Sequence, residues 1–535
     1  MDPVRLELFS NRFAAIASEM GVMLQRTAMS VNVKERLDFS CGMLDAEGRL
    51  LVNAPHIPVH LGALGECVRR VAAELELGAG DVAVTNHPGY GGSHLPDITV
   101  ISPVLVDGRL LGYVANRAHH AELGGIRPGS MPPEARNLAE EGVVIAPQYL
   151  VRAGEPQWER IETLLSRGPA PSRSVAENLA DLGAAVAANR RGVAALRQLA
   201  ADAGEEEVRR YMSALYSRAA GRMRSALEEH VRSTGRQSFR ARERLDDGSP
   251  IEVEVTVDRG SARIDFAGSA QVHSGNLNAT PAIVRSATIY VLRLLIGVPL
   301  QLNEGLLEPV DVEIPRGMLN PEFPADPRRC PAVVGGNVET SQRIVDTLIK
   351  ALGLCACGQG TMNNTLFGDD SFGYYETVGG GAGAGPGFRG ASGVHTHMTN
   401  TRITDPEVLE HRYPVRLERF AVRRGSGGPG RYPGGDGLRR ELRFLTPQQV
   451  SVLGQHRVER PYGVDGGKSG SVGRARILRA AGGVRELASV DQADVMPGDL
   501  LVLETPGGGG WGGIECPPVP AIGTGLASQQ KTGAE

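Results

Sequence analysis

The 535-residue chain lacks three features that would point to a membrane, to secretion or to nucleic acid. No apolar run reaches the ~18 residues that a membrane helix needs, and the N-terminus has no apolar stretch of the signal-peptide type. A net charge of −4 offers no electrostatic basis for binding nucleic acid. We therefore expect a cytoplasmic protein that contacts neither a membrane nor nucleic acid.

The cysteines are few and scattered. Six cysteines in 535 residues do not form a disulfide framework, which fits a reducing cytoplasm. Only one residue separates Cys355 from Cys357, and no second cysteine pair lies nearby. We interpret this pair as part of a core rather than as a metal or redox motif. No Gly-x-Ser-x-Gly motif is present either, so a serine or thiol nucleophile is not supported.

Glycine, in contrast, is abundant. It makes up 70 of the 535 residues, roughly twice the average share of about 7%. Because β-type apolar runs separate the clusters, they indicate tightly turning connections rather than disorder. Glycine also lets a backbone approach a ligand or another segment closely. The clusters lie at residues 379–393, 425–437, 463–473 and 507–513.

The chain is long enough for two to four domains, and its patterns predict a mixed α+β, multi-domain fold. We expect an N-terminal α/β region with a metal-binding hairpin, a helical insert and a β-rich, glycine-rich C-terminal half. The expected boundaries are 1–172 for the N-terminal domain, 173–235 for the helical segment, 236–410 for a middle α/β domain, 411–516 for a β-rich domain and 517–535 for a disordered tail.

Local patterns predict the main elements. Apolar residues at helical spacing predict two long helices in 173–233 with a break at Gly204. Period-two alternation predicts a hairpin of 251–257 with 262–266. Further helices are expected at 3–31, 61–75, 278–296 and 340–356, and further strands at 415–422, 439–445, 450–453, 475–478 and 500–503.

Histidines and a carboxylate flank a second predicted hairpin. Asp107-Gly108 separates two apolar runs, and this dipeptide favours a type I′ turn. With that turn, residue 96 lies opposite 119 and residue 94 opposite 121. His94, Asp97 and His119 then converge, although ideal pleating puts Asp97 on the other face and Pro96 interrupts the strand. Their nitrogen and oxygen atoms suit zinc, manganese, iron or cobalt.

Other histidines compete for a role near this site. His120 is an alternative to His119, and His56 and His60 can approach it as well. The simpler interpretation of each single histidine is a loop residue that hydrogen-bonds to the backbone. His395 and His397 would share a face if their segment were a strand; with Asn400 they are candidates for a substrate or supporting site, or simply for loop hydrogen bonds.

Six separated motifs then follow one another along the chain: Lys34–Cys41, Gly91–Asp97, Arg117–His120, Gly393–Asn400, Ser426–Gly428 with Gly434–Gly437, and Thr505–Gly512. Together they resemble the hydantoinase B/oxoprolinase family, and the resemblance extends to about residue 514. That family includes subunits of ATP-dependent N-methylhydantoinases, 5-oxoprolinases, lactamases and acetone or acetophenone carboxylases.

The resemblance implies a metal site and assigns roles to its residues. His94, Asp97 and His119 match the family's ligands, and Asp38 is a plausible fourth. The ion would be a divalent transition metal, with zinc or manganese favoured over iron or cobalt. Glu122, where many relatives are expected to have aspartate, and Asp38 are the candidates for moving protons. His120, His395, His397 and Asn400 would support the substrate.

The function implied is that of a metal-bearing subunit of an ATP-dependent cyclic-amide hydrolase, which opens a hydantoin, 5-oxoproline or lactam ring. ATP would bind to a hydantoinase A-like partner subunit, in a hetero-oligomer of dimers. The alternatives are a subunit of an ATP-dependent ketone carboxylase and a non-catalytic structural partner. Tyr462–Ser469 resembles a phosphate-binding loop, but Tyr462 occupies the position of its first glycine. We therefore expect no ATP site on this chain.

Overall fold

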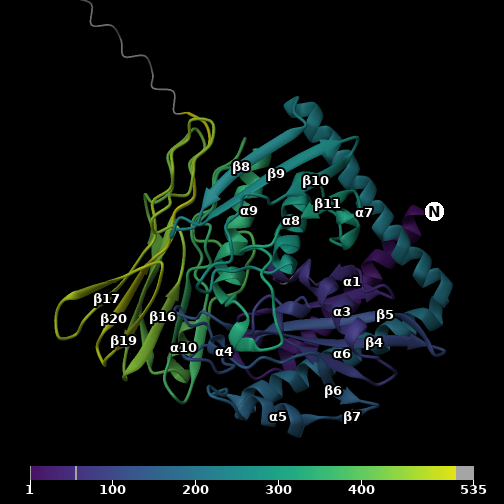
Figure 1. The fold of residues 1–535 in the computed structure, drawn as a ribbon. Helices are drawn as coiled ribbons and strands as arrows, with labels where there is room; N and C mark the ends of the chain where they lie inside the picture. The colour runs from purple at the N-terminus through teal and green to yellow at the C-terminus, as the bar shows by residue number, and fades with distance from the viewer. Residues whose placement is uncertain (1, 55–56, 514–535) are drawn as a thin grey trace, which may run out of the picture.

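The computed structural model describes residues 2–54 and 57–513 and contains helices and several sheets, as the sequence predicts (Figure 1). His56, the end of the expected β-rich domain and the expected tail 517–535 lie outside the described residues. No helix in the described part of the chain is long and apolar enough to cross a membrane.

The N-terminal sheet has seven antiparallel strands in the order β2-β1-β5-β4-β3-β6-β7. Helices α1 (Pro3–Thr27) and α6 (Val175–Ala203) share one hydrophobic core with it. The strands are β1 (Phe39–Asp45), β2 (Leu50–Asn53), β3 (Val82–Thr85), β4 (Asp97–Val106), β5 (Arg109–His119), β6 (Gln148–Arg152) and β7 (Glu155–Pro156).

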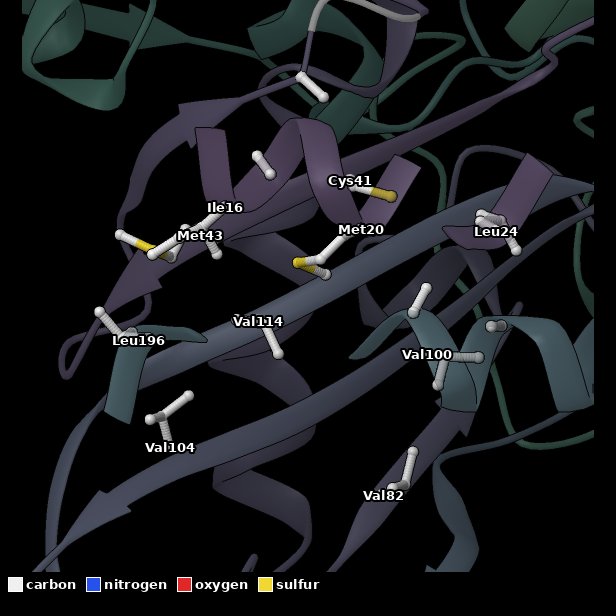
Figure 2. Packing of buried hydrophobic residues seen from close by; sticks show 14 of the residues in the cluster. Ile16, Met20, Leu24, Cys41, Met43, Val82, Val100, Val104, Val114 and Leu196 are labelled. Carbon is white, nitrogen blue, oxygen red and sulfur yellow. The ribbon is translucent and has the colours of Figure 1, made fainter. Parts of the chain in front are cut away.

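Successive residues of these strands belong to different cores, as the pleat of a strand requires. Val100 and Val114 pack with Met20 of α1 and Leu196 of α6 (Figure 2). Their neighbours, such as Ile101, instead join the cluster formed with helix α3 (Ala63–Glu74). The sheet is therefore a middle layer between helices, and its central strands are buried on both faces, whereas the edge strand β7 is exposed.

Helix α7 (Glu205–Thr234) joins the first layer to the second. It begins directly after Gly204, where the sequence predicts the break. Tyr211 and Leu215 belong to the first core, whereas Met223 and Leu227 belong to the core of the second sheet. The two helices of segment 173–235 thus pack into the cores of their neighbours.

The second sheet has the order β11-β10-β9-β8 and packs with α8 (Pro281–Ile296) and α9 (Ser341–Leu352). The expected hairpin forms its centre. A π-helical turn, Gly336–Thr340, leads directly into α9. The strands are β8 (Ser238–Arg244), β9 (Pro250–Asp258), β10 (Ser261–Asp265) and β11 (Val310–Glu313).

Two sheets occupy the left side of Figure 1. One has the order β13-β12-β16-β19 and the other β14-β15-β20-β17-β18. The boundary expected between residues 410 and 411 divides the first of them. The strands are β12 (Asn364–Gly368), β13 (Gly373–Glu376), β14 (Val415–Arg423), β15 (Gly437–Phe444), β16 (Gln448–Leu453), β17 (Arg474–Leu478), β18 (Val484–Leu487), β19 (Val490–Val495) and β20 (Leu500–Glu504).

Short helices complete the fold. They are α2 (Val31–Lys34), α4 (Leu138–Glu141), α5 (Trp158–Ser166), α10 (Pro406–Arg412) and the 3₁₀ turns Pro58–His60, Pro88–Tyr90, Glu304–Leu307 and Pro327–Arg329.

The four glycine clusters come together into one bundle, which we call the glycine bundle (379–393, 425–437, 463–473 and 507–513). Its segments hydrogen-bond backbone to backbone: Ala384 N–H donates to Gly509 O at 3.0 Å, and Gly508 N–H to Gly435 O at 2.9 Å. A Cβ on Gly381 would lie 1.9 Å from Gly435 O, and one on Gly508 would lie 1.9 Å from Ala382 O. The backbones are in direct contact, so no side chain fits between them.

We predict that Gly381→Ala lowers stability by roughly 2–3 kcal/mol, because the methyl group forces the backbones apart. Gly183→Ala is the control, since the Cβ of Gly183 in α6 would meet nothing within 4 Å. Alanine in a helix interior is favoured over glycine by about 0.5–1 kcal/mol. Thermal unfolding should give a lower midpoint for Gly381→Ala and an equal or higher one for Gly183→Ala; equal midpoints for the two variants would contradict this close packing.

Candidate metal centre

The hairpin of β4 and β5 forms as predicted, but with a different register. Asp107 and Gly108 both have positive φ, 47° and 75°, as a type I′ turn requires. Val104 pairs with Gly112 and Leu105 with Leu110, so the register shifts between these pairs. Leu111 is therefore the extra residue of a β-bulge on β5.

This bulge corrects the expected geometry of the site. Asp97, not residue 96, lies opposite His119. Directly paired residues of antiparallel strands point to the same face. Without the bulge, ideal pleating would put Asp97 on the face opposite to His119; with the bulge, the two side chains share a face, as their expected convergence requires.

His94 reaches the same point through a turn. The Asp97 N–H donates to His94 O at 3.2 Å, and β4 begins only at Asp97. The His120 N–H donates to Pro96 O at 2.8 Å and holds the turn on β5. Pro96 thus interrupts the strand as expected, and the turn folds His94 back over Asp97.

The three side chains converge on one carboxylate oxygen. His94 Nε2 lies 3.2 Å from Asp97 Oδ1, and His119 Nδ1 lies 3.4 Å from the same oxygen. All three residues are buried, with 2% or less of each exposed. A tetrahedral ion with bonds of ~2.0–2.1 Å holds its ligand atoms about 3.3 Å apart. The group therefore fits a divalent transition metal in both chemistry and spacing.

The protonation states suit a cation. Burial lowers the pKa of His119 and of His60, which keeps both imidazoles neutral near pH 7. Burial alone would raise the pKa of Asp97, but His94, His60 and the hydrogen bond from His119 hold it well below its usual value. Neutral imidazole and ionised carboxylate are the forms that bind a metal.

The second oxygen of Asp97 has its own partners. Ser93 Oγ donates to Asp97 Oδ2 at 2.5 Å, and His60 Nε2 lies 3.3 Å from the same atom. His60 Nδ1 in turn lies 3.0 Å from Ser40 Oγ. His60, which the sequence offers only as a secondary candidate, is thus the residue that orients the central carboxylate.

Asp38 lies beside this group rather than within it. Its backbone carbonyl accepts from the His119 N–H at 3.0 Å. Burial raises the pKa of its carboxyl group, and the charge of His119 is the largest influence that opposes the rise. The compact set of ligand atoms contains His94, Asp97 and His119 only, so a fourth ligand at Asp38 stays a prediction.

Comparison with known proteins identifies the relatives of this chain. A sequence model of the hydantoinase B/oxoprolinase family matches residues 2–514. The chain belongs to this family. It is 45% identical to 5-oxoprolinase 1 of Arabidopsis thaliana over 534 residues, which are 96% of this chain and 42% of the relative. The chain spans 40–42% of the length of the curated 5-oxoprolinases that it matches.

Solved structures share the fold. The ATP-dependent caprolactamase of Pseudomonas jessenii has a TM-score of 0.85 at 24% identity, covering 96% of this chain and 91% of that chain. A nucleotide-free acetone carboxylase has a TM-score of 0.82 at 18% identity, covering 96% of this chain and 76% of that chain. The hydantoinase B/oxoprolinase fold therefore also occurs in an acetone carboxylase.

Two residues expected beside the metal have other neighbours. The Glu122 carboxylate accepts from the N–H groups of Gly124 at 2.6 Å and Gly129 at 2.9 Å, and from Arg173 at 3.1 Å. It holds together the loop that follows β5. His120 Nδ1 lies 3.2 Å from Asn178 Nδ2 on α6. Neither side chain forms a hydrogen bond or ion pair with His94, Asp97 or His119 among the described residues, although the charge of Asp97 acts on the pKa of His120.

The segment of His395 and His397 is irregular rather than a strand, so its two imidazoles do not share a face by alternation. His397 has a φ of 57°, and its Nε2 lies 3.2 Å from Asp346 Oδ1. His395 is close enough to Arg36 that burial, together with this guanidinium, lowers its pKa to about 4. Asn400 is exposed. These candidates thus have different surroundings.

A cavity of about 520 Å³ lies next to the segment that precedes His94. Pro88, Gly89 and Gly91 form part of its wall, and Thr280, another lining residue, donates to Gly92 O at 3.2 Å. Its other lining residues include Glu66, Arg70, Arg316, Phe323 and Arg329.

We predict that His94→Ala removes one equivalent of divalent transition metal per chain. Loss of one of three protein ligands should weaken binding by roughly 100-fold or more. His120→Ala is the control, because His120 is an equally buried neighbour that contacts Asn178 instead. Elemental analysis of the purified proteins tests this: equal metal in wild type and His94→Ala would rule out the assignment.

Proposed function

We propose that this chain is the metal-bearing part of an ATP-dependent hydrolase that opens a five- or six-membered cyclic amide, such as 5-oxoproline, a hydantoin or a lactam. The observation that carries the proposal is the His94–Asp97–His119 group, with donor separations of 3.2 and 3.4 Å. Its support is the 45% identity to a plant 5-oxoprolinase and the fold shared with a caprolactamase.

The chemistry explains why both ATP and a metal would be needed. Resonance makes an unstrained amide a poor electrophile. Transfer of the terminal phosphoryl group of ATP to the amide oxygen activates the carbonyl carbon. One water adds to this carbon and the ring nitrogen leaves as an amine, which opens the ring and gives an acyl phosphate. A second water then converts the acyl phosphate into a carboxylate and free phosphate. A divalent ion supplies a Lewis acid that polarises an oxygen substituent or lowers the pKa of a water molecule.

The protein's own groups organise this step. Ser93 and His60 hold Oδ2 of Asp97, so that Oδ1 stays directed at His94 and His119. We assign to Asp38 the role of fourth ligand or proton carrier, since its buried carboxyl adjoins His119. Glu122 is assigned a supporting role, because a backbone turn and Arg173 occupy its carboxylate.

We assign the cavity beside Gly91 as the approach for the substrate. Three arginines line it, and two of them are paired with lining carboxylates, Arg70 with Glu66 and Arg316 with Glu322. The third, Arg329, leaves a net positive charge that suits an anionic substrate such as the carboxylate of 5-oxoproline. Gly91 lines the cavity, and only Gly92 and Ser93 lie between it and His94 in the sequence.

ATP is proposed to be handled outside this region. The 5-oxoprolinase relatives are longer chains of which this region forms 40–42%. The ATP-handling part is therefore either the remainder of a longer chain or a separate hydantoinase A-like subunit. A ketone carboxylase is the second candidate, favoured by the TM-score of 0.82 with acetone carboxylase.

We predict that residues 1–535 alone do not bind Mg-ATP. The Tyr462–Ser469 segment is irregular and is held by the glycine bundle, with Val464 N–H donating to Gly510 O at 3.0 Å. No helix follows it up to residue 513, where the described part of the chain ends, so its N–H groups are not gathered around a phosphate. Isothermal titration calorimetry should give no heat of binding. Micromolar affinity for Mg-ATP would contradict the proposal that ATP binds outside this region.

The reaction itself is tested with the ATP-handling part supplied. The chain is co-expressed with its hydantoinase A-like companion and incubated with 5-oxoproline, hydantoins or caprolactam, with and without ATP. ATP-dependent ring opening that His94→Ala abolishes and His120→Ala retains is the expected result. Turnover only with a ketone and bicarbonate would replace the hydrolase by the carboxylase. A metal-loaded complex inert to every substrate would contradict both.

A further inference from the structure

A second group of metal-type ligands lies apart from the first and shares no residue with it. Asp346 is on α9, Cys357 is in the segment that follows this helix, and His456 comes just after β16. One ligand atom from each lies within 4.8 Å of the other two, and all three residues are buried.

His456 is held in a state that can bind a metal. Its Nδ1 lies 2.7 Å from Glu459 O, and a carbonyl oxygen can only accept, so Nδ1 carries the proton. The lone pair is then on Nε2, which faces the other two residues. Fixing of a tautomer by a backbone carbonyl is typical of metal-binding histidines.

Asp346 offers an oxygen without a partner. His397 Nε2 lies 3.2 Å from Oδ1, whereas the buried Oδ2 has no hydrogen-bond partner among the described residues. Oδ2 lies 3.9 Å from His456 Nε2. In this tautomer neither atom carries a hydrogen, so the two atoms do not hydrogen-bond to each other. Burying a carboxylate oxygen in this situation is costly, and a cation between the two atoms would offset the cost.

The sulfur atom completes the set. Cys357 Sγ lies 3.6 Å from His456 Nε2. A tetrahedral zinc ion with bonds of ~2.3 Å to sulfur and ~2.0–2.1 Å to nitrogen places these two atoms about 3.6 Å apart. Sulfur, nitrogen and carboxylate oxygen together are a ligand set that selects zinc over magnesium or calcium.

We propose that Asp346, Cys357 and His456 bind a second divalent metal ion, zinc, and that His397 positions the Asp346 carboxylate for it. This assignment replaces the interpretation of Cys357 as plain core. The ion would tie together α9, the segment around Cys357 and the loop after β16. The π-helical turn that leads into α9 carries Asn337, whose Nδ2 lies 3.0 Å from His94 Nε2, so the second ion would brace the first site.

Cobalt substitution tests the site with a readout that only a thiolate provides. The chain is stripped with a chelator and reloaded with Co²⁺. We expect wild type to bind two ions per chain and to show a sulfur-to-cobalt charge-transfer band in the near ultraviolet. His94→Ala should keep the band and bind one ion. Cys357→Ser should lose the band and also bind one.

Cys355→Ser is the matched control, because Cys355 lies two residues away and is only half-buried. It should retain the band, and loss of the band in this variant instead of Cys357→Ser would overturn the assignment. Cys357→Ser could lose the band because it misfolds, so a second measurement uses a variant in which the second site is intact. Zinc X-ray absorption of His94→Ala should show a sulfur atom about 2.3 Å from the zinc ion. A nitrogen and oxygen shell alone, or no bound zinc, would refute the proposal and leave the proposed hydrolase untouched.

Discussion

The candidate site depends on the burial of one carboxylate, that of Asp97. A buried charge is costly unless charged or hydrogen-bonding partners surround it. Here the partners are Ser93, His60, His94 and His119, which come from the turn before β4, a 3₁₀ turn after β2 and the end of β5. Segments far apart in the sequence must therefore be in place before Asp97 is stabilised, and a cation between the histidines would complete its neutralisation.

Local signals predicted the elements well where a single residue controls the backbone. Gly204 separates α6 from α7, and Asp107-Gly108 closes the hairpin of β4 and β5. The register of that hairpin was not predictable in the same way. Its bulge inserts Leu111, an ordinary apolar residue that is fully buried, and nothing in the sequence distinguishes it from a regularly paired leucine. Strand β12 was missed because all of its residues are buried and the alternating pattern is absent.

The same limit applies to the sites. The His94, Asp97 and His119 cluster was predictable because one hairpin brings it together. His60, by contrast, reaches Asp97 from outside that hairpin, and Asp346, Cys357 and His456 are brought together by a helix, a loop and the end of a strand. Such contacts depend on how the sheets and helices pack against one another. The spacing of residues along the chain does not predict them. Spacing alone groups Cys355 with Cys357 as core residues, whereas the side chains near Cys357, those of Asp346 and His456, come from distant segments.

The glycine bundle has a consequence for the order in which the molecule is made. Its segments contact one another mainly through backbone atoms, and the last of them begins at residue 507, whereas the first begins at 379. During synthesis, segment 379–393 emerges from the ribosome well before segment 507–513. It can therefore contact that last segment only when nearly the whole described chain has been made. Contacts between such distant segments form slowly, and the N-terminal layers can already be packed by then. The bundle therefore forms late in folding. One of its contacts then fixes the segment of Cys357, because Gly509 N–H donates to the Cys357 carbonyl oxygen at 2.8 Å.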